Sequence, residues 1–211
     1  AIDACLISAQ GTMTSTAILG AIGTVIGLVR AVPQLIRLLR TRHAHGVSVD
    51  TAATSSIVSF GWATYGGLTN QPYVSFATGS SGVIFAIITV MALRFGRRIR
   101  EFMIAPLWLA VLLFVGIIAG KNGLGIVLPI SVLAANIPQL WIAHKEGDLA
   151  DLSLGTWLLS MTDGLVWGVY SLIQQDSAIM IFAGFQLISS GLIVALKLAH
   201  KSKHRKQGVG L

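Results

Sequence analysis

The feature that most constrains this chain is its series of long apolar blocks. Residues 16–29, 57–93, 102–120 and 124–143 each contain at most one charged residue. An α-helix needs about 20 mostly apolar residues to cross the hydrocarbon core of a bilayer, which is about 30 Å thick. Only 11% of the residues are charged, whereas a soluble domain carries about a quarter. The sequence therefore predicts an all-α integral membrane protein.

Helix-breaking residues and charges divide the chain into seven predicted transmembrane helices with short connections. Backbone N–H and C=O groups cannot stay unpaired in lipid, so each apolar block is expected to close its own hydrogen bonds as a helix. The predicted helices cover residues 14–38, 51–68, 73–93, 102–119, 125–143, 155–173 and 177–197.

The positive charge is concentrated on one side of these seven helices. Thirteen of the 15 Lys and Arg residues follow the first, third, fifth and seventh helices, while Lys121 lies on the other side and Arg30 within a helix. Cytoplasmic loops are enriched in Lys and Arg, so the amino terminus is predicted outside and the carboxyl terminus in the cytoplasm. The low charge and very short loops favour a bacterial plasma membrane, with an organelle membrane as the alternative. The net charge of +7 does not indicate nucleic acid binding, because the cations form no amphipathic or aromatic-interleaved patch.

The sequence gives no indication of metal, cofactor or enzyme chemistry. A single cysteine, Cys5, excludes an internal disulfide and a cysteine metal site. Neither a pair of buried carboxylates nor a nucleophile–base spacing appears, so no catalytic residues are expected. The histidines lie in predicted loops or in the tail, without the convergence that a metal requires: His43, His45, His144, His200 and His204.

The first three predicted helices repeat in the last three at a shift of 105 residues. The segment 32–35 matches 137–140, and the same shift pairs further residues without a gap: Ser48 with Ser153, Thr51 with Thr156, Trp62 with Trp167, Tyr65 with Tyr170, and Gly79 with Gly184. An odd number of helices per copy requires the fourth helix to re-invert the chain, so the copies are parallel. The predicted parts are a first triple-helix bundle at 14–93, a linker helix region at 94–124, a second bundle at 125–198 and a basic tail at 199–211.

The repeated residues resemble the PQ-loop superfamily. The match lies in Val32-Pro33-Gln34-Leu35 through Ser48 and its partner segment 137–153, and the Trp-x-x-Tyr pairs resemble those of the SWEET and SemiSWEET sugar transporters. This resemblance implies two triple-helix bundles joined by a linker helix, and alternating access without ATP hydrolysis. The superfamily also includes proton-coupled amino-acid exporters and a receptor that retrieves escaped endoplasmic-reticulum proteins.

Candidate hinge residues are the two repeated Pro-Gln pairs: Pro33, Gln34, Pro138 and Gln139. A proline inside a helix removes one backbone hydrogen bond and costs about 3 kcal/mol. A hinge in the cytoplasmic half of each bundle is one interpretation. A static kink that packing accommodates is the other.

Candidate solute-binding residues lie mid-span on both copies, where transporters built from such repeats bind their solutes. They are Trp62, Thr78, Asn136, Trp167, Ala183 and Gln186. A tryptophan offers a flat apolar face for stacking on a small solute, although an ordinary packing role is the alternative. The sugar-transporter pattern places an Asn beside the Gly in the third and seventh helices, and this chain has Thr78 and Ala183 there instead.

Candidate gating or coupling residues are Tyr65, Tyr170, Arg30 and Asp163. The tyrosines lie one turn beyond the tryptophans. A charge inside a bilayer costs at least about 2.5–3.5 kcal/mol, so it usually faces a partner or a cavity. Arg30 and Asp163 are predicted at similar depths, which suggests an ion pair at the inner gate. Alternatively, Asp163 titrates alone, or Arg30 extends to the cytoplasmic surface.

Three functions remain open from the sequence. The first is a carrier of a small solute, sugar-like by resemblance. The second is a proton-coupled exporter of an amino acid or other polar metabolite that uses Asp163. The third is a receptor or scaffold that transports nothing. The partners expected are the solute and the lipid bilayer, with association into a homo-oligomer left open.

Overall fold

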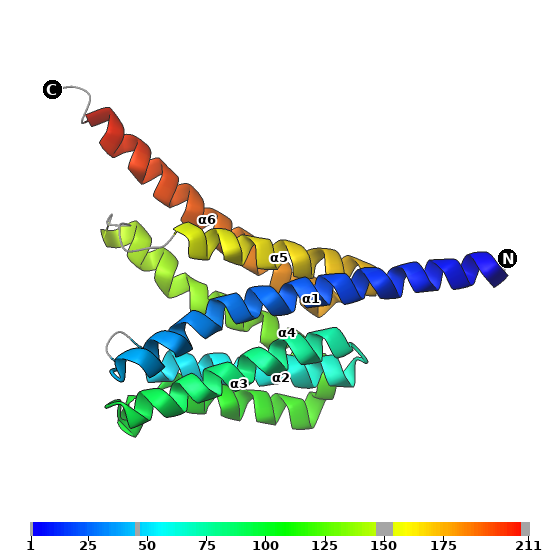
Figure 1. Cartoon of the computed structure of the whole chain (residues 1–211), viewed down its shortest axis with the longest axis horizontal. Helices are drawn as coiled ribbons and strands as arrows, with labels where there is room; N and C mark the ends of the chain where they lie inside the picture. Colours follow the sequence, from blue (N-terminus) through cyan, green and yellow to red (C-terminus); the bar gives the residue numbers. More distant parts are fainter. Residues whose placement is uncertain (1, 45–46, 147–153, 208–211) are drawn as a thin grey trace. The chain divides into compact units, whose positions relative to one another are not determined.

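The computed structural model describes the backbone of residues 2–44, 47–146 and 154–207, and the side chains of residues 14–44, 47–133 and 154–198. In this part of the chain the secondary structure is entirely helical (Figure 1). The elements are α1 (Ile2–Thr41), α2 (Val49–Leu68), α3 (Pro72–Arg94), the short 3-10 helix η1 (Ile99–Glu101), α4 (Ile104–Glu146), α5 (Leu154–Gln174) and α6 (Ser177–Gln207).

Two helices are longer than the sequence predicted. The helix α1 begins at Ile2 rather than near residue 14, and α6 continues through Gln207 into the predicted basic tail. A loop was predicted at 120–124, but α4 runs from Ile104 to Glu146 and only Gly120 departs from helical geometry, with φ 54° and ψ −140°. Glycine has no Cβ and adopts a positive φ at little steric cost. One glycine therefore replaces the predicted loop between two helical segments of α4.

Four helical stretches are long and apolar enough to cross a membrane: Thr14–Thr41, Pro72–Arg94, Ile104–Leu133 and Ser177–Leu198. Many of their large apolar side chains point outward, and Phe76 and Ile117 are 70% and 82% exposed. Such side chains are stable when they face lipid rather than water. The chain is an integral membrane protein. The shorter helix α2 carries six Ser and Thr residues as well as Asp50, and α5 carries Asp163, which lowers their hydropathy.

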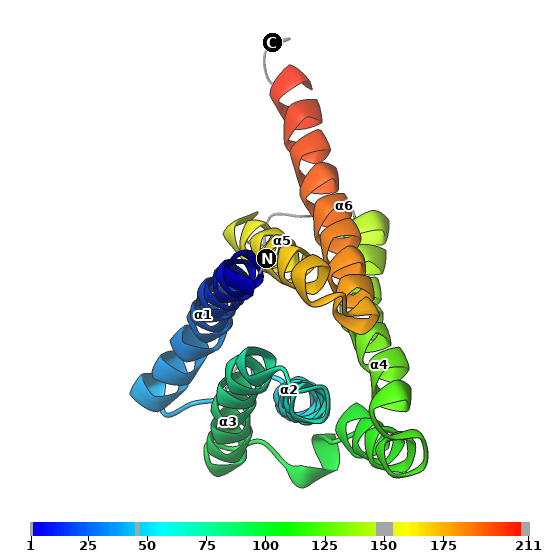
Figure 2. The same cartoon turned by 90° about the vertical axis from the view of Figure 1, so that its right-hand side faces the viewer.

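The chain forms two compact units, residues 1–128 and 129–211. In the first unit, α3 packs against both α1 and α2 (Figure 2). Glycines allow this close approach. A Cβ added at Gly20 of α1 would lie 2.5 Å from the Cβ of Tyr73, and one at Gly66 of α2 would lie 2.8 Å from the backbone nitrogen of Ser75. Glycine at these two positions therefore allows the helices to cross closely.

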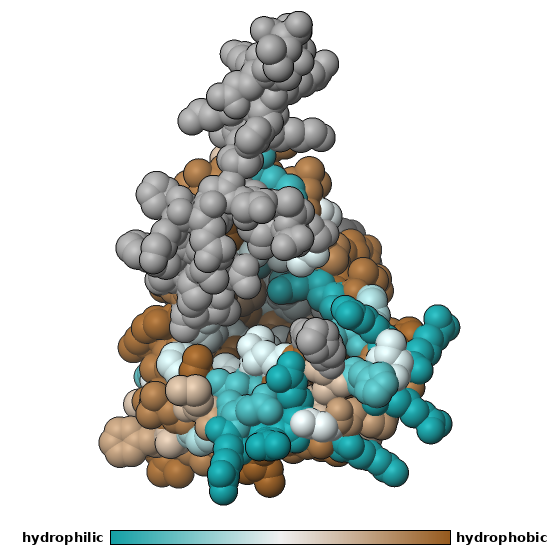
Figure 3. All heavy atoms as spheres, turned by 90° about the vertical axis from the view of Figure 1, so that its left-hand side faces the viewer, coloured by the Kyte–Doolittle hydropathy of each residue, from teal (hydrophilic) through white to brown (hydrophobic). Residues whose placement is uncertain are grey.

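One end of the first unit is closed by apolar packing beneath a basic surface. Leu38, Val47, Val49 and Ile88 are buried together there, with Phe95 and Phe102 against them. The last turns of α1 and α3 lie at this end. These turns and the residues that follow them carry seven arginines: Arg37, Arg40, Arg42, Arg94, Arg97, Arg98 and Arg100. Figure 3 shows hydrophilic side chains gathered on this face, with apolar ones along the sides. Two of the basic clusters counted in the sequence therefore share one end.

In the second unit, α5 packs against α6, and their tight turn matches the turn between α2 and α3. Asn70 and Gln175 both have a positive φ, 56° and 54°. The N–H of Gln71 donates to the carbonyl of Gly66 at 2.7 Å, and the N–H of Asp176 donates to the carbonyl of Ser171 at 3.0 Å. All three pairs of residues are separated by 105 positions. The two helix pairs thus enter the same turn in the same conformation.

Candidate functional site

Trp62 and Tyr65 lie one turn apart on α2 and pack on each other. Their ring centroids are 5.6 Å apart, and the ring planes meet at 86°. Both side chains are buried, with 6% and 7% of their surface exposed. An edge-to-face pair of aromatic rings is stabilised because the positive edge of one ring meets the negative face of the other. Trp62 is thereby held in a fixed orientation in the middle of α2.

Trp167 and Tyr170 repeat this arrangement on α5. Their centroids are 5.3 Å apart at an interplanar angle of 72°. Tyr170 is fully buried, and the side chain of Gln174 donates to its hydroxyl at 3.3 Å. The sequence predicted that these four aromatic residues correspond in pairs. The structure gives both pairs the same edge-to-face geometry within their own units.

Asp163 lies one turn before Trp167 and accepts a hydrogen bond from its indole. The distance from Trp167 Nε1 to Asp163 Oδ1 is 3.1 Å, and the Asp163 side chain is 6% exposed. The equivalent residue on α2 is Val58, which has no polar side-chain atom. This contact therefore has no counterpart beside Trp62. The sequence analysis did not predict this contact, although a spacing of four residues on one helix is a signal that could have found it.

The remaining candidate binding residues differ in polarity between the units. Thr78 donates its hydroxyl hydrogen to the carbonyl of Val74 at 2.7 Å, so its polar group is used within α3. Ala183 is buried on α6, and Gln186 is buried with its amide 3.5 Å from the hydroxyl of Ser190. The side chain of Asn136 lies outside the described residues.

The predicted hinge and charge residues are partly described. Helix α1 continues on both sides of Pro33, whose ring is exposed, and Gln34 is half-buried. Pro138 and Gln139 lie in the helical backbone of α4, and their side chains are outside the described part. Arg30 is exposed in the first unit, whereas Asp163 belongs to the second, so their pairing stays a prediction.

The sequence did not reveal the role of Asp50, which caps the amino terminus of α4 from the first turn of α2. Its Oδ1 accepts from the backbone N–H groups of Met103, Ile104 and Ala105 at 3.1, 3.1 and 2.9 Å, and its Oδ2 accepts from Ile104 at 3.0 Å. Burial by itself raises the pKa of Asp50, but these bonds outweigh it and hold that pKa below its ordinary value. A negative charge also suits a helix amino terminus. Asp50 therefore ties α2 to α4.

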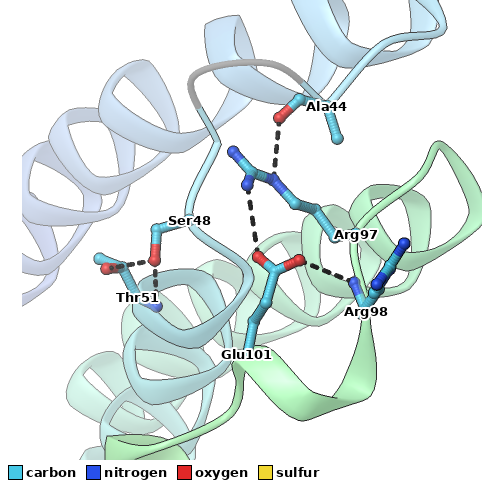
Figure 4. A network of polar contacts seen from close by, with 6 residues as sticks. All are labelled: Ala44, Ser48, Thr51, Arg97, Arg98 and Glu101. Atoms are coloured by element: carbon cyan, nitrogen blue, oxygen red, sulfur yellow. Dashed lines mark hydrogen bonds and ion pairs between the residues drawn. The ribbon is translucent and has the colours of Figure 1, made fainter.

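A second network ties the connection between α3 and α4 to the turn before α2 (Figure 4). Arg97 donates through Nε to the carbonyl of Ala44 at 3.2 Å and forms an ion pair with Glu101 at 3.3 Å. Glu101 accepts from the N–H of Arg98, and Ser48 caps α2 by accepting from the N–H of Thr51. Figure 4 shows Arg97 reaching from the connection across to Ala44.

Among the residues that the structure describes, no group of three His, Cys, Asp or Glu side chains is placed to hold a metal ion. The polar groups in the middle of the helices are a carboxyl, an amide and hydroxyls beside aromatic rings. Such a set binds uncharged or donor-bearing organic groups through stacking and hydrogen bonds.

Comparison with known proteins identifies the fold. No protein-family model matches the sequence, and no curated protein matches it. A solved structure of a eukaryotic SWEET transporter is similar, with a TM-score of 0.73 and 14% sequence identity over 90% of this chain and 99% of that chain. At this identity the likeness concerns the fold. The chain is a helical membrane protein with a SWEET-like fold.

Proposed function

We propose that this protein is a carrier that moves a small solute across a membrane by alternating access. The repeated Trp–Tyr pair carries this proposal, because both units offer a buried aromatic face at equivalent positions. The fold similarity to a SWEET transporter supports it. The Trp-x-x-Tyr pairs resemble those of the SWEET and SemiSWEET sugar transporters, so the solute proposed first is sugar-like.

The proposed architecture has seven membrane spans in a three-one-three layout. Two observations support it. The non-helical Gly120 divides α4 into two helical segments, and the turns after α2 and α5 share their geometry at a shift of 105 residues. The proposed orientation, with the carboxyl terminus in the cytoplasm, draws on the basic end of the first unit.

The binding residues proposed are Trp62, Thr78, Asn136, Trp167, Ala183 and Gln186, and the gating residues are Tyr65, Tyr170, Arg30 and Asp163. Pro33 and Pro138, each followed by glutamine, are the proposed hinges. The carbonyl of Val29 loses its usual helical donor at Pro33, since proline has no N–H, and this local weakness allows bending.

A second candidate is transport coupled to protons through Asp163. The buried position of this carboxyl and its hydrogen bond with Trp167 favour it. In that case the solute is an amino acid or another polar metabolite. A receptor without transport has no such specific observation behind it.

Uptake into liposomes that contain the purified protein tests the proposal. Labelled sugars and amino acids are offered with and without a pH gradient. We expect saturable uptake of at least one solute, and loss of most of it when Trp62→Ala and Trp167→Ala are combined. Unchanged uptake by this double variant refutes the chosen site. Uptake that is independent of the pH gradient and is retained in the Asp163→Asn variant excludes proton coupling.

A further inference from the structure

The connection between α3 and α4, residues 94–104, lies within the first unit where two membrane spans end. The span of α3 ends at Arg94, and that of α4 begins at Ile104. One turn inside each span, Val90 and Leu107 are 57% and 65% exposed, as expected of apolar side chains that face lipid. The connection therefore lies at the level where the hydrocarbon core gives way to the lipid headgroups.

The backbone of this connection is fixed at both ends. Gly96 has a φ of 112° and turns the chain at the end of α3. At the other end, Asp50 accepts hydrogen bonds from the backbone N–H groups of residues 103–105. Phe95 and Phe102 pack against the buried apolar cluster beneath the connection. The backbone that carries its exposed side chains is consequently held in one conformation.

Six exposed arginines lie at this end of the first unit, three of them on the connection. Within the described part of the chain none of the six forms an ion pair. The carboxylates of the same end are already engaged, since Glu101 binds Arg97 and Asp50 caps α4. Figure 3 shows hydrophilic side chains extending outward from this end. The six arginines are Arg37, Arg40, Arg42, Arg94, Arg98 and Arg100.

The type of these basic residues is informative as well as their charge. Among the first 120 residues every Lys or Arg position is an arginine, and lysine occurs only from Lys121 onward. A guanidinium group is a planar fork of N–H donors that matches two oxygens of one phosphate, whereas an ammonium group is a point charge. A cluster made of arginine alone therefore favours a phosphate ligand over an unspecific anionic surface.

Two large apolar side chains lie among the arginines of the connection. Ile99 is 73% exposed and Met103 is 79% exposed, and Arg98 and Arg100 directly flank Ile99 in the sequence. Apolar side chains with basic neighbours are typical of segments that lie in the membrane interface, where the apolar groups enter the boundary between headgroups and acyl chains. The ligand that fits this surface thus combines a negative charge with an apolar part.

We infer that the connection between α3 and α4 binds the headgroup of an anionic phospholipid. The guanidinium groups of Arg94, Arg98 and Arg100 donate to oxygens of the phosphate diester, and Ile99 and Met103 extend into the acyl boundary beside it. A zwitterionic headgroup is disfavoured, because its ammonium group is repelled by the clustered arginines. This lipid site is separate from the proposed transport of a solute and does not depend on it.

Headgroup binding is measured by native mass spectrometry of the full-length protein in uncharged detergent micelles, with phosphatidylglycerol and phosphatidylcholine as probes. We expect the wild type to bind phosphatidylglycerol more tightly. Each arginine near an anionic headgroup changes the affinity about fivefold, so Arg94→Gln, Arg98→Gln and Arg100→Gln together are expected to raise the Kd for phosphatidylglycerol about 100-fold. Lysine at the same three positions keeps the charge without the fork, and an intermediate rise is expected.

The matched control combines Lys197→Gln, Lys201→Gln and Lys203→Gln, which remove the same charge from another part of the chain, and it is expected to leave the Kd nearly unchanged. Equal affinity of the wild type for both lipids overturns the site, and so does an equal loss of affinity in the control. Full affinity of the lysine variant contradicts recognition by the guanidinium fork. Displacement of phosphatidylglycerol by inorganic phosphate at equal concentration makes a free anion the ligand and overturns the lipid.

The depth of the apolar side chains is measured in phosphatidylglycerol vesicles by electron paramagnetic resonance. A nitroxide label is attached to a single cysteine, introduced as Ile99→Cys or Met103→Cys in a Cys5→Ser background. Both labels are expected to be more accessible to oxygen than to a water-soluble nickel chelate, though less so than a label at Leu113→Cys, a 55% exposed position within the α4 span. Labels as accessible to the chelate as a free nitroxide in water overturn the proposed insertion, whether or not the arginine variants fold.

Discussion

Removal of the Asp50 carboxylate is expected to loosen the start of α4 while α2 stays folded. Asp50 accepts from three consecutive backbone N–H groups across 53 to 55 residues of sequence. Loss of an ordinary N-cap costs about 0.5–2 kcal/mol. Bonds to a charged acceptor are roughly twice as strong as neutral ones, and partial exposure of Asp50 allows water to replace some of them. We therefore expect Asp50→Ala to cost about 2 kcal/mol, near the upper end of that range.

Hydrogen–deuterium exchange measured by mass spectrometry checks this value locally. About 2 kcal/mol corresponds to roughly 30-fold faster exchange of the amides of Met103, Ile104 and Ala105. The matched control is Asp176→Ala. Asp176 accepts from the N–H of Ile179 at 3.0 Å at the start of α6, so its loss is expected to speed exchange there and to leave residues 103–105 unchanged. Unaltered exchange at residues 103–105 in Asp50→Ala refutes the reasoning.

The same carboxylate predicts how stability depends on pH. The pKa of Asp50 is lowered in the folded protein from its ordinary value of 3.8. The ionised form is therefore favoured by folding, and its contribution is complete above pH 3.8 and lost as pH falls through the folded pKa. The difference in Tm between the wild type and Asp50→Ala is expected to shrink below that pH. A difference that grows on acidification contradicts the assignment.

Three further substitutions have defined outcomes. Gly20→Leu places a Cβ 2.5 Å from the Cβ of Tyr73, and we expect a loss of about 1–3 kcal/mol, measured as a lower Tm in detergent; an unchanged Tm contradicts the close crossing. Gly120→Val forces a β-branched residue to a φ of 54°, and we expect a loss of about 1–3 kcal/mol of stability. The control is Gly184→Val, because Gly184 has open space around it. Arg97→Ala is expected to cost under about 1 kcal/mol, because its ion pair with Glu101 is partly exposed; a larger drop in unfolding free energy shows that the contact with Ala44 dominates.

The regular helices could be predicted from the sequence, because an apolar block in lipid can pair its backbone N–H and C=O groups only by forming a helix. The starts of α2, α3 and α6 lie within two residues of the predicted positions. The predicted break between two helices at residues 120–124 is present, but it consists of one non-helical residue, Gly120, rather than a loop of five residues. A short break in a helix depends on the backbone dihedral angles of one or two residues, and hydropathy does not predict those angles.

Part of the candidate site could be predicted from the sequence for a similar reason. The aromatic pairs and the Asp163–Trp167 contact join residues three or four positions apart, so helical spacing alone brings them together. Asp50 joins residues more than 50 positions away. Such a contact depends on how helices pack, and no local pattern encodes it. The polarity difference between α2–α3 and α5–α6 can be found in the sequence by comparing residues at the shift of 105. Only the structure shows which of these side chains are buried.

The most direct test of the central claim is a counterflow experiment in proteoliposomes. Vesicles are loaded with a high concentration of unlabelled glucose and diluted into a trace of labelled glucose, with glucosamine and an amino acid tested in parallel. A carrier that exposes one site alternately to each side exchanges inner for outer solute, so a transient accumulation of label above equilibrium is predicted for at least one solute. The Trp62→Ala, Trp167→Ala double variant is predicted to abolish it. Label that only rises to equilibrium, or that accumulates equally in the double variant, contradicts a carrier with these tryptophans at its binding site.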